Sequence, residues 1–241
     1  MAQNEFSTNK QFMLSTGLQI DGVAWMMGRT QTIPYSSTYG SLQFEPQALN
    51  YSMEIKEGSA PWQTVNLTLQ TGIILYNMPT TAYTLGTHYF DQISSNGSLL
   101  QQGSSAPVSD VYGIEKLPMS DGNFLRIAVV PTIRMLNTTV GNQNYIEFYL
   151  PLLQKGTNLG LSQSVTLIGQ PVTQYVQSGV TQVRFNATFP KASAGFDSAF
   201  FPFRNTLNNN QYTVTLNLDP YSGSTVELYI GNVSVSIGLY G

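Results

Sequence analysis

Residues 223–241 read GSTVELYIGNVSVSIGLYG, and the alternation of apolar and polar residues within them decides the fold class. A two-residue turn at Gly231-Asn232 would suit a type II′ hairpin, because glycine would occupy its first position. Such a turn would bring three apolar pairs into register: Ile230 with Val233, Leu228 with Val235, and Val226 with Ile237. All these side chains would lie on one face, with polar residues on the other, as a half-buried antiparallel pair requires. We therefore expect the chain to finish inside a β-sheet.

The same period-two alternation recurs along most of the chain, whereas helical periodicity is almost absent. Clear examples are the ranges 50–56, 64–70, 183–189 and 212–218. Two stretches, GVAWMMG at 22–28 and FLRIAVVPTIRM at 124–135, are more continuously apolar and suit strands covered on both faces. Pro131 would place the second of these at an edge or a bulge. Only GTHYFDQISS at 86–95 is a candidate for a helix.

Turn-rich clusters separate these runs, and their frequency favours an all-β fold, an antiparallel β-sandwich or jelly roll. The polar segment QQGSSAPVSD at 101–110 is the best candidate for a linker. About eight strand-like runs precede it and about eight follow, as two eight-stranded jelly rolls would require. We therefore expect a double jelly roll, with one β-sandwich over residues 1–103 and a second over residues 104–241. A single elaborated jelly roll is the alternative.

The composition predicts a neutral, hydrogen-bonding surface. Charged residues make up only 10% of the 241 residues, compared with roughly 25% in an average soluble domain. The net charge is −3, and the ten Lys and Arg residues are scattered along the chain. No basic stripe is present that could neutralise a phosphate backbone, so we expect no direct nucleic-acid binding.

Several kinds of segment and site are missing from the sequence. Cysteine is absent, which removes disulfides, thiolate metal sites and cysteine nucleophiles. The start, MAQNEFSTNK, does not read as a secretory signal. The apolar runs are shorter than the roughly 20 residues that span a bilayer, so we expect no membrane span.

Catalytic chemistry has little support. His88 is the only histidine, and no nucleophile elbow, zinc-protease motif, P-loop or dinucleotide fingerprint occurs. The densest acidic group, Glu45, Glu54 and Glu57, falls where solvated charges ordinarily lie, with Glu54 on the polar face of an expected strand and Glu57 in the following turn. We expect no enzyme activity, no catalytic or metal-binding residues and no cofactor. A β-sandwich glycan hydrolase or lyase is the enzyme alternative, because such enzymes need only two carboxylates.

The segment FDSAFFPFRN at 196–205 contains more phenylalanine than one inward face accommodates. Its four phenylalanines are candidates for a subunit contact: Phe196, Phe200, Phe201 and Phe203. A loop that plugs the end of its own barrel is the alternative.

Six N-x-S/T sequons occur, where random placement would give about three or four. Five fall on expected solvent faces or loops and are candidates for glycosylation: Asn50, Asn66, Asn96, Asn137 and Asn186. The sixth, Asn232, would lie inside the tight turn of the expected hairpin.

The all-β pattern, the neutral surface and the terminal VSVSIGLYG together resemble jelly-roll capsid proteins of tailless icosahedral viruses. The resemblance concerns the layout of the whole chain and includes no diagnostic motif. It implies a homo-oligomer, expected to be a trimer, that forms a shell with other virion proteins after synthesis in the host cytoplasm. The alternative from another class is an exported, extracellular β-sandwich module that binds carbohydrate or a surface, such as an adhesin, surface-layer or fibre protein.

Overall fold

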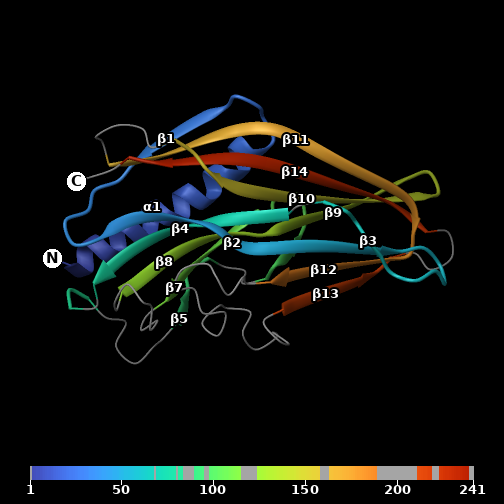
Figure 1. Cartoon of the computed structure of the whole chain (residues 1–241), viewed down its shortest axis with the longest axis horizontal. Coiled ribbons are helices and arrows are strands. Elements are labelled where there is room, and N and C mark those ends of the chain that lie inside the picture. The colour runs from blue at the N-terminus through green and yellow to red at the C-terminus, as the bar shows by residue number, and fades with distance from the viewer. Residues whose placement is uncertain are drawn as a thin grey trace.

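The computed structural model describes residues 2–67, 69–79, 81–83, 90–94, 98–114, 124–157, 163–188, 211–218 and 223–238. Within them one helix, α1 (Ala2–Ala24), accompanies two curled β-sheets (Figure 1). In spatial order, the strands of sheet A are β1 (Thr30–Pro34), β11 (Ser164–Val180), β14 (Ser224–Ile237), β10 (Gln143–Lys155), β9 (Ile133–Val140) and β6 (Leu100–Gln102). Those of sheet B are β13 (Gln211–Asn217), β12 (Gln182–Thr188), β2 (Ser41–Lys56), β4 (Leu69–Pro79), β8 (Phe124–Pro131), β7 (Ser109–Ile114) and β5 (Phe90–Gln92), with β3 (Gln63–Thr64) beside β2. The expected all-β, sandwich-like architecture is confirmed.

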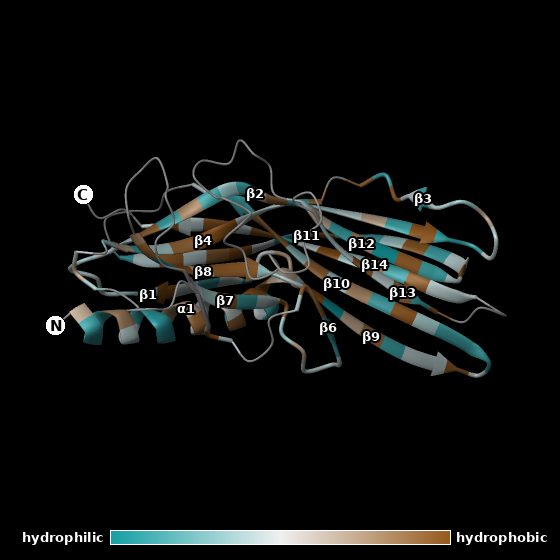
Figure 2. Ribbon diagram, turned by 90° about the horizontal axis from the view of Figure 1, so that it is seen from below, coloured by the Kyte–Doolittle hydropathy of each residue, from teal (hydrophilic) through white to brown (hydrophobic). Residues whose placement is uncertain are grey.

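Two clusters of buried apolar side chains hold these layers together. The first lies between the sheets, where the rings of Phe148 and Phe185 meet edge to face with centroids 4.8 Å apart. The second surrounds α1, which lies between β1, β11 and β14 on one side and β4 and β8 on the other (Figure 1). Ile73 and Ile74, adjacent on β4, belong to different clusters, so β4 is covered on both faces. Figure 2 accordingly colours β4 and β8 mostly hydrophobic.

Helix α1 was not expected from the sequence, and the interpretation of residues 22–28 as a strand is wrong. Its buried face follows helical spacing but includes polar residues: Phe6, Asn9, Phe12, Met13, Thr16, Gly17, Ile20, Val23 and Ala24. Thr16 and Asn9 are tolerated there because Thr16 Oγ1 donates to Phe12 O at 2.9 Å and Asn9 Nδ2 to Glu5 O at 3.0 Å. These polar residues weaken the apolar periodicity by which a helix is recognised.

The C-terminal end of α1 lies directly against sheet A. Gly28 N donates to Gly169 O, and Gly169 N donates to Arg29 O, each at 2.9 Å. A Cβ atom at Gly169 would overlap the carbonyl oxygens of Val23 and Met26. At Gly231 on the neighbouring strand, a Cβ would lie 2.6 Å from Ala24 O. Only glycine lets the helix approach both strands this closely.

The expected C-terminal hairpin is wrong, because β14 runs straight through Gly231-Asn232 from Ser224 to Ile237. It pairs on one side with β10 and on the other with β11. In a straight strand, side chains an odd number of residues apart point to opposite faces. Val226, Leu228 and Ile230 therefore join the cluster between the sheets. Val233, Val235 and Ile237 join the cluster around α1.

The sequence predicts purely antiparallel sheets, but sheet A also contains parallel strand pairs. Strands β10 and β14 pair in parallel over residues 145–155 and 225–235, and β6 pairs in parallel with β9. A long stretch of chain separates the members of each pair, which parallel pairing requires because the chain must return to the same end. Both pairs lie in sheet A.

The expected division after residue 103 does not separate the sheets. Five strand pairs join a strand before this position to one after it: β1 with β11, β2 with β12, β4 with β8, β5 with β7 and β6 with β9. The candidate linker 101–110 instead connects β6 in sheet A to β7 in sheet B. The described strands thus form one pair of sheets and not one pair per half.

Two other local expectations can be compared with the structure. β8 is buried on both faces, as expected, and it ends at Pro131, after which the chain leaves sheet B and enters β9 of sheet A. Proline is tolerated at position 131 because the pairing of β8 with β4 has already ended at Val129.

The candidate helix at 86–95 is wrong where it is described, because Phe90–Gln92 form β5.

Contact between α1 and Gly169 leads to a stability prediction. We expect Gly169→Ala to lower the free energy of unfolding by about 1–3 kcal/mol, since the added methyl group overlaps backbone atoms that cannot move independently. Gly22→Ala is the matched control, because its Cβ would meet nothing closer than 3.8 Å. In a helix this change should raise stability by about 1 kcal/mol. Denaturant unfolding of both variants checks the prediction, and equal effects would contradict the placement of α1.

Candidate functional site

The outer face of sheet A presents an aromatic surface, defined here as Trp25, Tyr149, Val172, Val176 and Tyr229. Parallel pairing of β10 with β14 sets Tyr149 beside Tyr229. Their rings stack with centroids 5.0 Å apart and planes 12° apart. Trp25, just beyond α1, meets the ring of Tyr149 edge-on at 5.2 Å. The two tyrosine side chains point away from the core between the sheets, because their neighbours Phe148 and Leu228 point into it.

Exposed aliphatic side chains extend this surface. Val172 and Val176 on β11 are 40% and 48% exposed, and Val176 pairs with Glu227 of β14. The turn after α1 adds Met26 and Met27, which are 53% and 76% exposed. Exposed apolar side chains beside half-buried aromatic rings are typical of surfaces that bind another protein.

Two glutamates lie side by side within the aromatic surface, and tyrosine hydroxyls hold both. Tyr149 Oη donates to Glu147 Oε2 at 2.6 Å, and Tyr229 Oη makes a short hydrogen bond to Glu227 Oε2. The hydrogen bond to Glu227, together with burial, raises the pKa of Tyr229 to about 12. The tyrosines therefore remain protonated at neutral pH and keep donating to the carboxylates.

A cation also lies at this surface. The Arg134 guanidinium lies 5.0 Å from the centre of the Tyr149 ring and forms an ion pair with Asp21 at 2.8 Å. Asp21 in turn accepts a hydrogen bond from Trp25 Nε1 at 2.7 Å. This chain of contacts fixes Trp25 against Tyr149, so the aromatic surface is held in place from the helix side and the sheet side.

The outer face of sheet B has a different character. A hollow of about 420 Å³, called here the polar hollow, is lined by Ser52, Glu54, Thr64, Arg184, Asn186 and Thr213. Strand register explains this set: Arg184 lies opposite Glu54, and Asn186 lies between Ser52 and Thr213. Their sequence neighbours Met53 and Phe185 point into the core. Alternation therefore places every lining side chain on the outer face.

A connected hydrogen-bond network orders the polar hollow. Arg184 donates two parallel hydrogen bonds to Glu54, from Nε to Oε2 at 2.7 Å and from Nη2 to Oε1 at 2.9 Å. Asn186 Nδ2 donates to Glu54 Oε2 at 2.9 Å, and Asn186 Oδ1 accepts a hydrogen bond from Thr213 Oγ1 at 2.8 Å. The guanidinium of Arg184 also covers the ring of Trp62, with 4.4 Å to the ring centre. The planar groups in the hollow are thus fixed in orientation.

The charges in the polar hollow balance each other. The hydrogen bonds from Arg184 lower the pKa of Glu54, more than burial raises it. The same contact raises the pKa of Arg184. Both groups are therefore ionised at neutral pH, and the pair contributes no net charge.

A buried carboxyl group, Asp110, lies apart from both surfaces. Its side chain is fully buried and accepts hydrogen bonds from Ser94 Oγ, Gln101 Nε2 and Tyr112 Oη at 3.1, 3.0 and 2.9 Å. Burial raises its pKa to about 6, because the hydrogen bonds only partly offset the loss of hydration. Asp110 therefore carries a buried charge at neutral pH.

The described residues include only some of the candidates named from the sequence. His88, Asn96 and the phenylalanines Phe196, Phe200, Phe201 and Phe203 lie outside them. Of the remaining sequons, Asn66 and Asn137 are exposed, and Asn50 is half-buried. Asn186 is only 6% exposed, which differs from the expected solvent position, and its amide nitrogen is engaged with Glu54. Asn137 lies in β9 and not in a loop. Glycosylation at these positions stays a prediction.

The sequence contained a signal for the aromatic surface that the initial interpretation missed. The segments IEFYL at 146–150 and VELYI at 226–230 share one pattern, and they pair residue for residue in the parallel register. Matching short segments of this kind place like residues side by side when the strands are parallel. The acidic residues singled out from the sequence do not gather: Glu54 lies in the polar hollow, Glu57 accepts from Gln177 Nε2 at 2.8 Å, and Glu45 is buried.

Among the described residues, no three His, Cys, Asp or Glu side chains gather closely enough to hold a metal ion. The one helix in this part of the chain lacks the apolar length that crossing a membrane would take. Comparison with models of protein families, with curated proteins and with solved structures finds no match to this chain.

The buried position of Asp110 predicts how stability depends on pH. Its unfolded pKa is near 3.8 and its folded pKa near 6, so between these values the folded protein binds a proton that the unfolded chain has released. Stability should therefore fall as the pH rises through this window. We expect Asp110→Asn to be more stable than the wild type at pH 7.5, with the difference shrinking toward pH 4, as measured by urea unfolding.

Glu54→Gln serves as the control for this experiment. The pKa of Glu54 is lowered, so its stabilisation is present above the unfolded value and is lost as the pH falls. This variant should be less stable than the wild type at pH 7.5, the opposite sign from Asp110→Asn. The same sign for both variants would contradict the assignment.

Proposed function

We propose that this chain is a non-enzymatic structural subunit of an icosahedral virus shell, assembled into the virion in the host cytoplasm. The observation that carries the proposal is the aromatic surface, where Val172 and Val176 are exposed beside stacked Tyr149 and Tyr229. Tyr, Trp and Met are enriched where protein surfaces meet, and Lys is depleted there. The partner in this proposal is a second copy of the chain, within a cyclic homo-oligomer that we expect to be a trimer.

The fold that we propose for the subunit is a single elaborated jelly roll. The observation in its favour is that strands from both halves of the sequence share both sheets. The parallel pairs β10 with β14 and β6 with β9 are the elaboration, since a simple jelly roll is antiparallel.

Low charge supports the same proposal. Charged residues make up 10% of the chain, and Asp21 and Arg134, which lie at the aromatic surface, neutralise each other in an ion pair. The two glutamates in the aromatic surface already accept hydrogen bonds from Tyr149 and Tyr229, which reduces the penalty of covering them. The segment with Phe196, Phe200, Phe201 and Phe203 is proposed as a second contact between subunits.

The proposal predicts the effect of one charge in the aromatic surface. We expect Val176→Lys to shift the purified chain from oligomer to monomer, because an ammonium group would have to be buried at the interface. Light scattering coupled to size-exclusion chromatography, over a hundredfold range of concentration, measures the mass.

Val140→Lys is the matched control, because this valine is 63% exposed and lies at the tip of the β9–β10 hairpin, away from the aromatic surface. It should leave the oligomer unchanged. A wild-type chain that stays monomeric at every concentration would reject the proposal, as would equal behaviour of the two variants.

A further inference from the structure

We propose that the polar hollow on the outer face of sheet B binds a neutral saccharide. This inference is independent of the proposed shell assembly, which depends on the opposite outer face. Each of the six described residues that line the polar hollow has a hydrogen-bonding side chain: Ser52, Glu54, Thr64, Arg184, Asn186 and Thr213. The volume of about 420 Å³ is within the range of small-molecule sites.

The network in the polar hollow leaves both donors and acceptors available. Arg184 uses Nε and one Nη2 proton on Glu54, and its Nη1 group makes no hydrogen bond to the described part of the chain. Glu54 accepts three hydrogen bonds, from Arg184 twice and from Asn186, out of about four that a carboxylate can accept. Thr64 adds a hydroxyl group, and Ser52 adds another whose oxygen accepts a long hydrogen bond from Asn186 Nδ2 at 3.3 Å. A sugar hydroxyl both donates and accepts, so adjacent donors and acceptors match it.

The site is rigid before any ligand arrives. Arg184 and Glu54 are held by two parallel hydrogen bonds, and the ring of Trp62 supports the guanidinium from one side at 4.4 Å. Asn186 is held from both ends, by Glu54 and by Thr213. Groups fixed in this way lose little conformational entropy on binding, which favours affinity for a weakly binding neutral ligand.

Charge selects among hydrogen-bonding ligands. A phosphate, sulfate or carboxylate would need an uncompensated cation, but Arg184 is already neutralised by Glu54. A cationic ligand would need a spare carboxylate, and among the described residues Glu54 is the only acidic group that lines the hollow. The Arg184–Glu54 pair therefore favours a ligand without charge.

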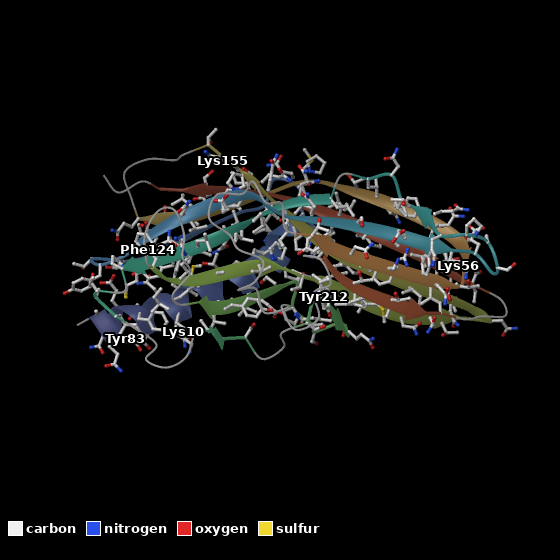
Figure 3. The ribbon with its side chains drawn as sticks, turned by 60° about the horizontal axis from the view of Figure 1, so that its bottom comes forward. Lys10, Lys56, Tyr83, Phe124, Lys155 and Tyr212 are labelled. Atoms are coloured by element: carbon white, nitrogen blue, oxygen red, sulfur yellow. The ribbon has the colours of Figure 1, made fainter. Side chains whose placement is uncertain are left out.

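The neighbouring surface extends the site along the strands. A second hollow of about 290 Å³ is lined by Lys56, Gly58, Thr181, Gln182, Asn217 and Leu218. Gln182 lies opposite both Lys56 and Asn217, one step along β12 from the row that contains Arg184. Figure 3 shows Lys56 near the end of the molecule away from Lys10 and Tyr83. A second hollow beside the polar hollow, with Leu218 as an apolar contact and Gln182 and Asn217 as hydrogen-bonding groups, fits a further unit of an oligosaccharide.

The experiment is titration calorimetry of the purified chain with neutral probes. The probes are glucose, galactose, mannose and N-acetylglucosamine, with the β1,4-linked and α1,4-linked disaccharides of glucose and an array of neutral and acidic glycans. We expect at least one neutral saccharide to bind, with an affinity that does not change between 50 and 500 mM salt. Thr213→Tyr, which fills the hollow, should weaken that binding at least tenfold.

Thr139→Tyr is the matched control. Thr139 is an exposed strand threonine in sheet A whose Oγ1 donates to Asn144 Oδ1 at 2.8 Å, the same bond that Thr213 makes to Asn186. It should bind as the wild type does, and circular dichroism should show both variants folded. The proposal is overturned if no neutral saccharide binds, if only acidic glycans bind with a steep salt dependence, or if both folded variants bind equally. Shell assembly is measured separately by light scattering, so failure of either proposal is distinguishable from failure of the other.

Discussion

Close contact between the end of α1 and two glycines of sheet A is the constraint on which the rest of the structure depends. At Gly169 and Gly231 a side chain would run into the backbone of residues 23–26. With the helix in this position, α1 covers the part of sheet A that carries Val233, Val235 and Ile237, and these side chains are buried. Trp25, which follows the helix directly, is placed against Tyr149. The position of Trp25 in the aromatic surface is therefore a consequence of how the helix packs, and parallel pairing of β10 with β14 places the two tyrosines.

Contact with α1 also explains why one Gly-Asn pair forms a β-turn whereas another continues a strand. Gly141-Asn142 joins β9 to β10, and Gly141 adopts a φ of 62°, which glycine tolerates well. Gly231-Asn232 continues a strand, with partners on both sides. Glycine is required at position 231 because a side chain there would overlap Ala24, and not because the chain turns. Local sequence predicts a hairpin at both positions, and only the tertiary contact distinguishes them.

The sequence predicted strands well where one face of the strand is wet and the other dry, because alternation then reports the two environments directly. It did not predict α1, since the polar residues Asn9 and Thr16 occupy buried positions, where each donates a side-chain hydrogen bond to a backbone carbonyl of the helix. The polar face containing Glu54 was predicted correctly, but its partner Arg184 lies 130 residues away, and no local pattern reveals such a pairing. The sequence analysis also missed the parallel pairing, because the two strands lie about 80 residues apart in the chain. The match of IEFYL with VELYI was the one local signal of this pairing.

The two outer surfaces share one core, and this relation determines how they can act together. Tyr149 is next to Phe148 in sequence, and Arg184 is next to Phe185, while the two phenylalanine rings meet between the sheets. The aromatic surface and the polar hollow therefore lie back to back across a single layer of side chains. Contacts between subunits through one sheet would leave the other sheet facing outward. If copies of the chain associate through the aromatic surface, as we propose, the polar hollow on the opposite side of the shared core keeps its hydrogen-bonding groups open to solvent.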